Sequence, residues 1–279
     1  MKKVFLNSFY NLVDLLKQDS RCLGAWYYGS ISRGLEDEYS DIDVVFLIDG
    51  NHFESFSSVI SDYVGKVCDE VVNIWPEGYN CDELKNFQHV IRLNDELFMI
   101  DFFVLNSIKN DCWIARQHYM DLSPKQVIFD KHGEVKELIK RSPKGSKANF
   151  DVSYVISTYY THLCMLIKYF LREDYFKLRK NIDFLYNAHA ELLLSQYDKI
   201  GWGDYCNKIK QCVPKNMQEH LKLYMTSSDI EIIKKEILAC AESFASDAQK
   251  ICQDIKVQYP KRTEQLIIKE YKKNKSTNT

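Results

Sequence analysis

The feature that most constrains this sequence is a pair of aspartates inside an apolar segment. Asp41 and Asp43 flank Ile42 at the start of residues 42–48, IDVVFLI, whose apolar run predicts a buried strand. Side chains two residues apart on a strand project from the same face. Two carboxylates placed there repel each other and lose hydration, which is costly without a counter-ion. Mg²⁺ removes that cost, since it takes carboxylate, phosphate and water oxygens as ligands.

A glycine–serine pair stands ten residues before these aspartates. Gly29 and Ser30 follow residues 22–28, CLGAWYY, a second apolar run that predicts a strand. Glycine lets the backbone approach a phosphate closely, and Ser30 can donate its hydroxyl and its backbone N–H to a phosphate oxygen. We therefore expect a phosphate loop and a metal pair at adjacent strand ends. The alternative, that Asp41 and Asp43 are ordinary surface acids, leaves this spacing unexplained.

A third acid, Asp101, lies in the middle of the apolar segment FMIDFFV, residues 98–104. A carboxylate buried alone there would be costly or would stay protonated. Pairing with the metal ions, or accepting a proton from a substrate hydroxyl, would account for it. The alternative is a hydrogen-bonded acid of the core.

The rest of the pattern divides the chain into an α/β half and a helical half. The polar run 142–149, SPKGSKAN, predicts the boundary, and we expect domains at 1–145 and 146–279. The second domain should be a bundle of about five helices, with the final stretch KEYKKNKSTNT frayed. Apolar periodicity predicts helices over 3–18, 52–66, 133–141, 151–172, 175–198 and 229–257, and further strands over 70–75, 87–93, 97–105 and 126–129.

Composition excludes several classes of protein. The net charge of −2 argues against a nucleic-acid partner, and no apolar run is long enough for a membrane helix. The N-terminal segment predicts an amphipathic helix of the mature protein. Nine cysteines without a CxxC pair indicate free thiols in a reducing cytoplasm and argue against zinc, and the histidines show no ligand spacing. The absence of GxxxxGK[ST] and GxGxxG argues against P-loop and dinucleotide-binding folds.

The segment from Gly29 to Asp43, GSISRGLEDEYSDID, together with Asp101, resembles the DNA polymerase beta-like nucleotidyltransferase superfamily. It looks especially like the branch of aminoglycoside and lincosamide nucleotidyltransferases. The resemblance implies an α/β (α+β) nucleotidyltransferase domain with a mixed sheet of about five strands. An all-α helical-bundle domain that clamps substrate and triphosphate would follow it.

The resemblance also implies roles for individual residues. Asp41 and Asp43 would hold one or two Mg²⁺ ions with a nucleoside triphosphate, expected to be ATP, and Asp101 would be a third metal ligand or the general base. Gly29 and Ser30 would bind the triphosphate.

Further residues are candidates for supplying positive charge to the triphosphate or for contacting the acceptor. Arg33 is a candidate for triphosphate binding, with a solvent-facing loop charge as the alternative. In the helical half, basic residues cluster near the turn between two long helices, and Lys168 is the candidate that reaches the triphosphate. Tyr160 could line the acceptor pocket, or it could be a core residue. Glu36, in the acidic run 36–38, could attract a cationic acceptor, or the run could be a solvated charged loop.

The expected function is adenylyl transfer to a hydroxyl of an aminoglycoside or lincosamide, by a cytoplasmic monomer or homodimer. The second hypothesis is an antitoxin-type nucleotidyltransferase that modifies or masks a toxin protein, although those chains are usually shorter. A non-enzymatic nucleotide sensor would have lost one of the acids, and none is lost. An RNA-tailing polymerase would carry a more basic surface.

Overall fold

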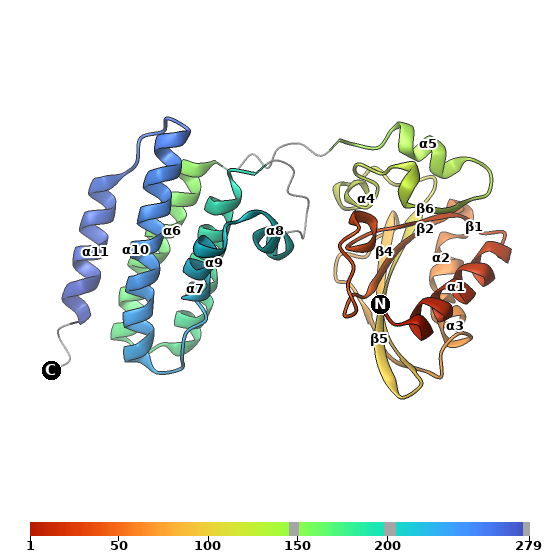
Figure 1. The fold of residues 1–279 in the computed structure, drawn as a ribbon, viewed down its shortest axis with the longest axis horizontal. Helices are drawn as coiled ribbons and strands as arrows, with labels where there is room; N and C mark the ends of the chain where they lie inside the picture. The colour runs from red at the N-terminus through yellow and green to blue at the C-terminus, as the bar shows by residue number, and fades with distance from the viewer. Residues whose placement is uncertain (145–150, 198–204, 276–279) are drawn as a thin grey trace. The chain divides into compact units, whose positions relative to one another are not determined.

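The computed structural model describes residues 1–144, 151–197 and 205–275 of the chain (Figure 1). It separates into two compact units, residues 1–144 and 145–279. The division falls within the polar run 142–149. Residues 145–150, the end of the helix expected over 175–198 and the last four residues lie outside the described part.

The first unit is built on one mixed six-stranded sheet, in the order β3-β4-β5-β2-β1-β6. Only β2 and β5 run parallel, and every other neighbouring pair is antiparallel. Each of the six segments expected to be a strand forms one strand of this sheet. The strands are β1 (Cys22–Tyr27), β2 (Ile42–Ile48), β3 (Glu70–Pro76), β4 (Leu84–Leu93), β5 (Glu96–Asn106) and β6 (Val127–Asp130).

Helices cover both faces of this sheet, and the alternation of side chains along β2 separates two cores. Val44 and Phe46 pack with α1 (Lys3–Gln18), α2 (Phe53–Ser57) and α3 (Ile60–Gly65). Val45 and Leu47 point to the opposite face, where they pack with α4 (Trp113–Gln117) and α5 (Glu134–Lys140). The strand period of two places Asp43 on the same face as Val45. The sheet thus directs the predicted site residue toward the α4–α5 side.

The expectation of a single helix over 52–66 is wrong. The segment forms a short 3₁₀ turn over Gly50–His52 and then α2 and α3, which are separated at Ser58 and Val59. Serine hydroxyls bond to nearby backbone carbonyls, as when Ser57 Oγ donates to Phe53 O at 2.7 Å and Ser58 Oγ to Ser55 O at 3.0 Å. Such local bonds compete with the helical ladder, so a run rich in serine breaks where apolar spacing alone predicts continuity.

The described part of the second unit contains six helices, one more than expected. Its core is centred on Tyr159 and Phe244, whose rings stack with centroids 3.5 Å apart. The expectation of a frayed end is wrong as far as Lys275, because α11 continues to that residue. The helices are α6 (Val152–Leu171), α7 (Tyr175–Leu194), α8 (Tyr205–Cys212), α9 (Lys215–Lys222), α10 (Ile230–Asp254) and α11 (Lys261–Lys275).

Two further expectations were the absence of a membrane-spanning helix and the presence of free thiols. No helix within the described residues combines the length and apolar character that a membrane span needs. All nine cysteines are free thiols.

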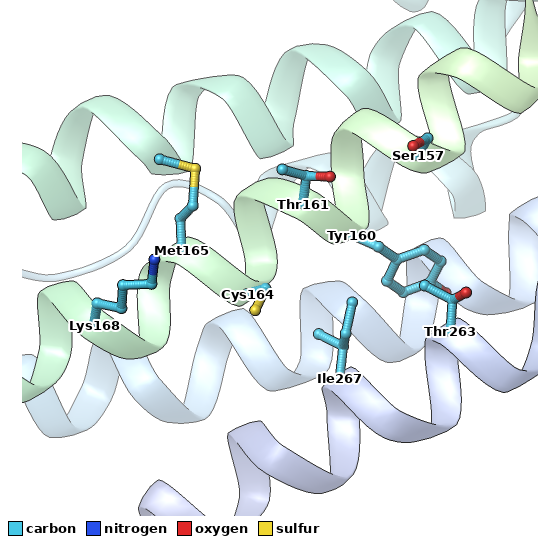
Figure 2. A pocket seen from close by; sticks show the side chains of 8 residues that line it. All are labelled: Ser157, Tyr160, Thr161, Cys164, Met165, Lys168, Thr263 and Ile267. Atoms are coloured by element: carbon cyan, nitrogen blue, oxygen red, sulfur yellow. The ribbon is translucent and has the colours of Figure 1, made fainter.

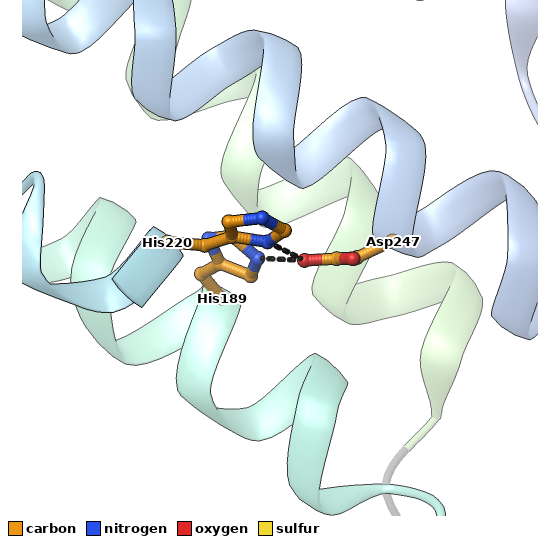
Figure 3. Close-up of side chains that lie close together, drawn as sticks. All are labelled: His189, His220 and Asp247. Carbon is orange, nitrogen blue, oxygen red and sulfur yellow. Dashed lines mark hydrogen bonds and ion pairs between the residues drawn. The ribbon is translucent and has the colours of Figure 1, made fainter. Parts of the chain in front are cut away.

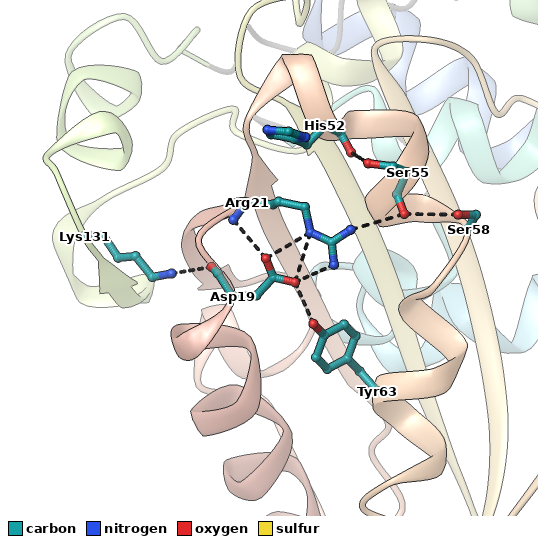
Figure 4. Close-up of polar contacts among 7 residues, drawn as sticks. All are labelled: Asp19, Arg21, His52, Ser55, Ser58, Tyr63 and Lys131. Carbon is teal, nitrogen blue, oxygen red and sulfur yellow. Dashed lines mark hydrogen bonds and ion pairs between the residues drawn. The ribbon is translucent and has the colours of Figure 1, made fainter.

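A buried carboxylate joins the end of α1 to its neighbours in the first unit (Figure 4). Asp19 accepts hydrogen bonds from the Arg21 guanidinium at 2.6 Å and from the Tyr63 hydroxyl at 2.6 Å. Lys131 donates to the Asp19 backbone carbonyl at 2.6 Å. Burial raises the pKa of Asp19, but the bonds from Arg21 and Tyr63 outweigh it and hold that pKa well below its usual value. The charged carboxylate therefore links the end of α1 to the residue before β1 and to α3.

We predict that Asp19→Asn destabilises the first unit by about 3 kcal/mol, because it leaves the Arg21 charge partly buried and unpaired. Urea unfolding followed by tryptophan fluorescence measures this, since three of the four tryptophans (Trp26, Trp75 and Trp113) lie in this unit. The control is Asp14→Asn, which removes an exposed ion pair to Lys17 and should cost less than about 1 kcal/mol. Equal effects of the two variants would contradict the assignment.

Candidate active site

A row of polar side chains crosses the sheet on the face that carries α4 and α5. In the parallel pairing of β2 with β5, Asp43 stands opposite Asp101. Asp101 in turn stands opposite Gln88 of β4. Past the end of β1, the Tyr28 backbone N–H donates to the Asp43 carbonyl at 3.0 Å. Neighbouring strands lie about 4.8 Å apart, so the Asp43 and Asp101 carboxylates share one small region of this face.

The glycine of the Gly-Ser pair is required by two independent features. Gly29 has a φ of +57°, in the left-handed region that side chains disfavour. A Cβ atom at this position would overlap the carboxylate of Asp43. The turn after β1 therefore passes directly over Asp43, and Ser32 Oγ secures it by donating to the Gly29 carbonyl at 2.8 Å.

Burial and neighbouring charges raise the pKa of Asp43 to about 7. Burial is the largest cause, and the charges of Asp41 and Asp101 add to it. Arg33 and a backbone hydrogen bond from Ser30 act in the opposite direction. The site therefore carries an excess of negative charge that its own cation only partly offsets, which is the situation that the sequence pattern indicated.

Asp101 is held in place by two amides of β4. Asn86 Nδ2 donates to one carboxylate oxygen, and Gln88 Nε2 donates to the other at 3.4 Å. Burial raises the pKa of Asp101 to about 6, in spite of these hydrogen bonds and with a contribution from the charge of Asp41. A carboxyl group with a pKa in this range can exchange a proton near neutral pH.

Ser30 has the properties of a phosphate-binding residue. Its hydroxyl oxygen is buried and has no hydrogen-bond partner among the residues that the structure describes. A buried hydroxyl without a partner is uncommon and points to an absent ligand. Arg33, from the 3₁₀ turn Ile31–Arg33, is close enough to Asp43 to influence its pKa. The turn thus brings Gly29, Ser30 and Arg33 to the carboxylates.

These residues fit a hydrated Mg²⁺ ion bound to a triphosphate. Mg²⁺ is usually held by one or two carboxylates, with phosphate and water oxygens completing its shell. Asp41 and Asp43 supply the carboxylates, and Ser30, whose hydroxyl has no partner within the described residues, bonds to Asp43 through its backbone N–H. Among the described residues, Asp41, Asp43 and Asp101 do not form a closed three-ligand group. The donor set therefore suits an ion that takes its remaining ligands from a substrate.

The acidic run 36–38 is exposed, and part of it is ordered by local bonds. The Asp37 carboxylate accepts from the Tyr39 backbone N–H at 2.9 Å, and the Asp37 N–H donates to Ser40 Oγ at 2.8 Å. Asp37 therefore shapes the loop, whereas the neighbouring Glu36 side chain is exposed to solvent.

Lys168 and Tyr160 belong to the second unit, where they line one pocket of about 380 Å³ between α6 and α11 (Figure 2). Lys168 is exposed, whereas Tyr160 is buried and its hydroxyl bonds to that of Tyr259. Two other basic residues of the expected cluster are paired locally, Lys177 with Asp174 at 3.0 Å and Arg179 with Asp183 at 3.0 Å. The triphosphate and acceptor roles of Lys168 and Tyr160 stay predictions.

Sequence reasoning missed the residues that support the aspartates from neighbouring strands. Asn86, Gln88 and Tyr28 are ordinary residues in the sequence, and only the strand register brings them to Asp101 and Asp43. The one available signal was the strand period: Asn86 and Gln88 are two apart, as expected for polar residues on one face of β4.

Comparison with known proteins is consistent with this geometry. Residues 10–106 match the family model of the nucleotidyltransferase domain, and this range contains Gly29–Asp43 and Asp101, the residues that resemble the nucleotidyltransferase superfamily. This range includes β1 to β5 and therefore the whole row of site residues.

Matches to solved structures are weaker. An aminoglycoside 6-adenyltransferase from Bacillus subtilis is 12% identical, with a TM-score of 0.40 over 99% of this chain and 100% of that one. A putative nucleotidyltransferase from H. pylori is 11% identical, with a TM-score of 0.29 over 92% and 98%. TM-scores this low say nothing about the acceptor. No curated protein matches the chain.

We predict that Asp43 makes the metal-free protein less stable as the pH rises from about 4 to about 7. The folded state keeps a proton on Asp43 in this range and the unfolded chain does not, so raising the pH favours unfolding. Asp43→Asn should remove the larger part of this slope, leaving the part that comes from the raised pKa of Asp101, and should stabilise the protein at pH 8 by a few kcal/mol. Urea unfolding in EDTA, followed by tryptophan fluorescence, measures both effects.

The matched control is Asp62→Asn, an exposed acid of α3. It should leave the slope unchanged. Adding Mg²⁺ at pH 8 should stabilise the wild type more than Asp43→Asn. A slope as steep in Asp43→Asn as in the wild type would show that Asp43 does not cause it.

Proposed function

We propose that the nucleotidyltransferase domain of this protein transfers AMP from ATP to a hydroxyl group of a small molecule, an aminoglycoside or lincosamide antibiotic, with release of pyrophosphate. One observation carries the proposal. The Gly29 turn lies against Asp43 and leaves the buried Ser30 hydroxyl without a partner, beside carboxylates that repel one another. A triphosphate with a divalent cation satisfies both needs at once.

Nucleotidyltransferases generally use a nucleoside triphosphate and a divalent metal ion. Mg²⁺ held by Asp41 and Asp43 would neutralise charge on the triphosphate and on the departing pyrophosphate. The Ser30 hydroxyl and N–H would donate to a phosphate oxygen, and Arg33 would add a positive charge. Because phosphoryl transfer needs little covalent chemistry from the protein, these residues act mainly by positioning and by balancing charge.

Asp101 is the candidate general base. The acceptor hydroxyl oxygen would form a bond to the α-phosphorus while the bond from that phosphorus to the β-phosphate oxygen breaks. The hydroxyl proton would pass to Asp101, whose pKa of about 6 suits a group that accepts a proton near neutral pH. Asn86 and Gln88 support this role, since their amides fix the carboxylate in one orientation.

The proposed class of acceptor follows from the acidic run 36–38, which comes shortly after the Gly29–Arg33 turn. Glu36 and Glu38 are exposed, and they follow the Gly29–Arg33 turn directly. Their negative charge would attract an acceptor that carries ammonium groups, as aminoglycosides do. We propose that the second unit clamps the substrates, with Lys168 directed to the triphosphate and Tyr160 to the acceptor.

The first test is a pyrophosphate-release assay. ATP, GTP, CTP and UTP are each offered with Mg²⁺ against a panel of aminoglycosides and lincosamides. We expect release with ATP that depends on one drug, is lost in the double variant Asp41→Ala/Asp43→Ala, and falls about 10²–10⁴-fold in Asp101→Asn. Asp62→Asn should keep full activity, because Asp62 lies on α3, on the opposite side of the sheet.

Two outcomes would count against the proposal. Nucleotide binding without drug-dependent release would overturn the antibiotic acceptor and favour a protein target, as in the antitoxin-type alternative. Absence of nucleotide binding would overturn nucleotidyl transfer itself.

We further predict that Glu36→Gln raises KM for a cationic acceptor several-fold and leaves kcat nearly unchanged. The reason is that an exposed charge contributes to attraction of the acceptor and not to the transition state. The effect should shrink as salt is added, because salt screens exposed charges. Steady-state kinetics at low and high ionic strength measure it, and a fall in kcat with unchanged KM would contradict the assignment.

A further inference from the structure

A cluster of three metal-ligating side chains lies in the second unit, on three different helices. His189 comes from α7, His220 from α9 and Asp247 from α10 (Figure 3). One ligand atom from each lies within 4.8 Å of the other two, and this is the one such group of three within the described ranges. Nothing in the proposed nucleotidyl transfer uses these residues.

The two imidazoles converge on a single carboxylate oxygen. Asp247 Oδ2 lies 3.0 Å from His189 Nε2 and 2.8 Å from His220 Nδ1. In a tetrahedral zinc site, metal–ligand bonds of about 2.0–2.1 Å place donor atoms about 3.3 Å apart. The Asp247 oxygen would therefore have to move by only a few tenths of an ångström from each imidazole nitrogen to reach that spacing.

The surroundings orient His189 as metal-binding histidines are usually oriented. Its second ring nitrogen, Nδ1, lies 3.0 Å from the Tyr224 hydroxyl, which lies 2.9 Å from the Tyr159 hydroxyl. Metal-bound histidines almost always use their second nitrogen in such a bond. Because hydroxyl groups can donate or accept, the chain of two tyrosines can reverse its direction. His189 can then carry its proton on Nδ1 and offer Nε2 to a metal.

Burial completes the comparison with a metal site. His189 and Asp247 are buried, whereas the His220 side chain is 31% exposed, which gives an ion a route from solvent. Histidine binds a metal ion as the neutral ring and aspartate binds it as the carboxylate.

We propose that His189, His220 and Asp247 form a binding site for one Zn²⁺-class divalent ion that joins α7, α9 and α10. Two imidazoles and one carboxylate suit zinc and its neighbours in the transition series and not Mg²⁺, which prefers oxygen ligands only. Three protein ligands leave a fourth position for water. The site is independent of the Mg²⁺ proposed at Asp41 and Asp43, because it lies in the other unit and uses different donor atoms.

The test is metal binding by the full-length protein. Purified protein is stripped with EDTA, dialysed and titrated with Zn²⁺ in a calorimeter, and its thermal unfolding is recorded with and without Zn²⁺. We expect one high-affinity equivalent and a rise in the melting temperature of the wild type. His220→Ala, which changes a half-exposed side chain, should lose at least tenfold in affinity and most of the rise. The matched control His132→Ala, an exposed histidine of the first unit, should bind as the wild type does.

Cobalt distinguishes this site from binding by the nine cysteines. Co²⁺ held by nitrogen and oxygen gives a visible d–d absorption without the near-ultraviolet charge-transfer band of thiolate ligands. We expect this spectrum in the wild type and in Asp41→Ala/Asp43→Ala, and its loss in His220→Ala. Absence of stoichiometric binding, equal binding by His220→Ala, or a thiolate spectrum would each overturn the proposal and leave the cluster as a hydrogen-bonded network only.

Discussion

Repulsion among partly buried carboxylates is the constraint on which the first unit depends. The parallel pairing of β2 with β5 sets Asp43 opposite Asp101, and the strand geometry keeps both side chains on one face of the sheet. The fold limits the cost in three ways: the amides of Asn86 and Gln88 bond to Asp101, the Ser30 backbone bonds to Asp43, and Arg33 supplies a positive charge. These contacts do not cancel the excess charge, since the pKa values of both acids stay raised. A bound cation would stabilise a site of this kind.

The part of the site that is local in sequence could be predicted from it. The Gly29–Asp43 segment contains several of the site residues, and one turn and the strand that follows it bring Gly29, Ser30 and Asp43 together. Most strands and long helices were also predictable, since each has a clear period of two or 3.6. Where the prediction was wrong, a local effect outweighed periodicity, as with the serines that break residues 52–66 into α2 and α3.

What could not be predicted depends on contacts between distant segments. The support of Asp101 by Gln88 follows from the register of β4 with β5, and a slip of one residue would turn Gln88 to the other face. His189, His220 and Asp247 are an extreme case. Each lies on a different helix, and none has a ligand within three or four residues, so no spacing rule for metal sites detects them. The same holds for Asp19, whose partners Tyr63 and Lys131 come from elsewhere in the first unit.

The carboxylates of the first unit and the His189–His220–Asp247 cluster of the second differ in donor atoms. Because of this difference, each would select a different metal ion. Carboxylates beside a phosphate turn offer only oxygen, so they suit Mg²⁺, which binds weakly and exchanges together with its nucleotide. Imidazole nitrogens bind ions of the zinc class far more strongly than they bind Mg²⁺. The second cluster is also already closed by hydrogen bonds between its members, whereas the first leaves a buried hydroxyl without a partner. An ion bound by donors from α7, α9 and α10 would hold these three helices together, whereas an ion at the carboxylates of the first unit would arrive with its substrate.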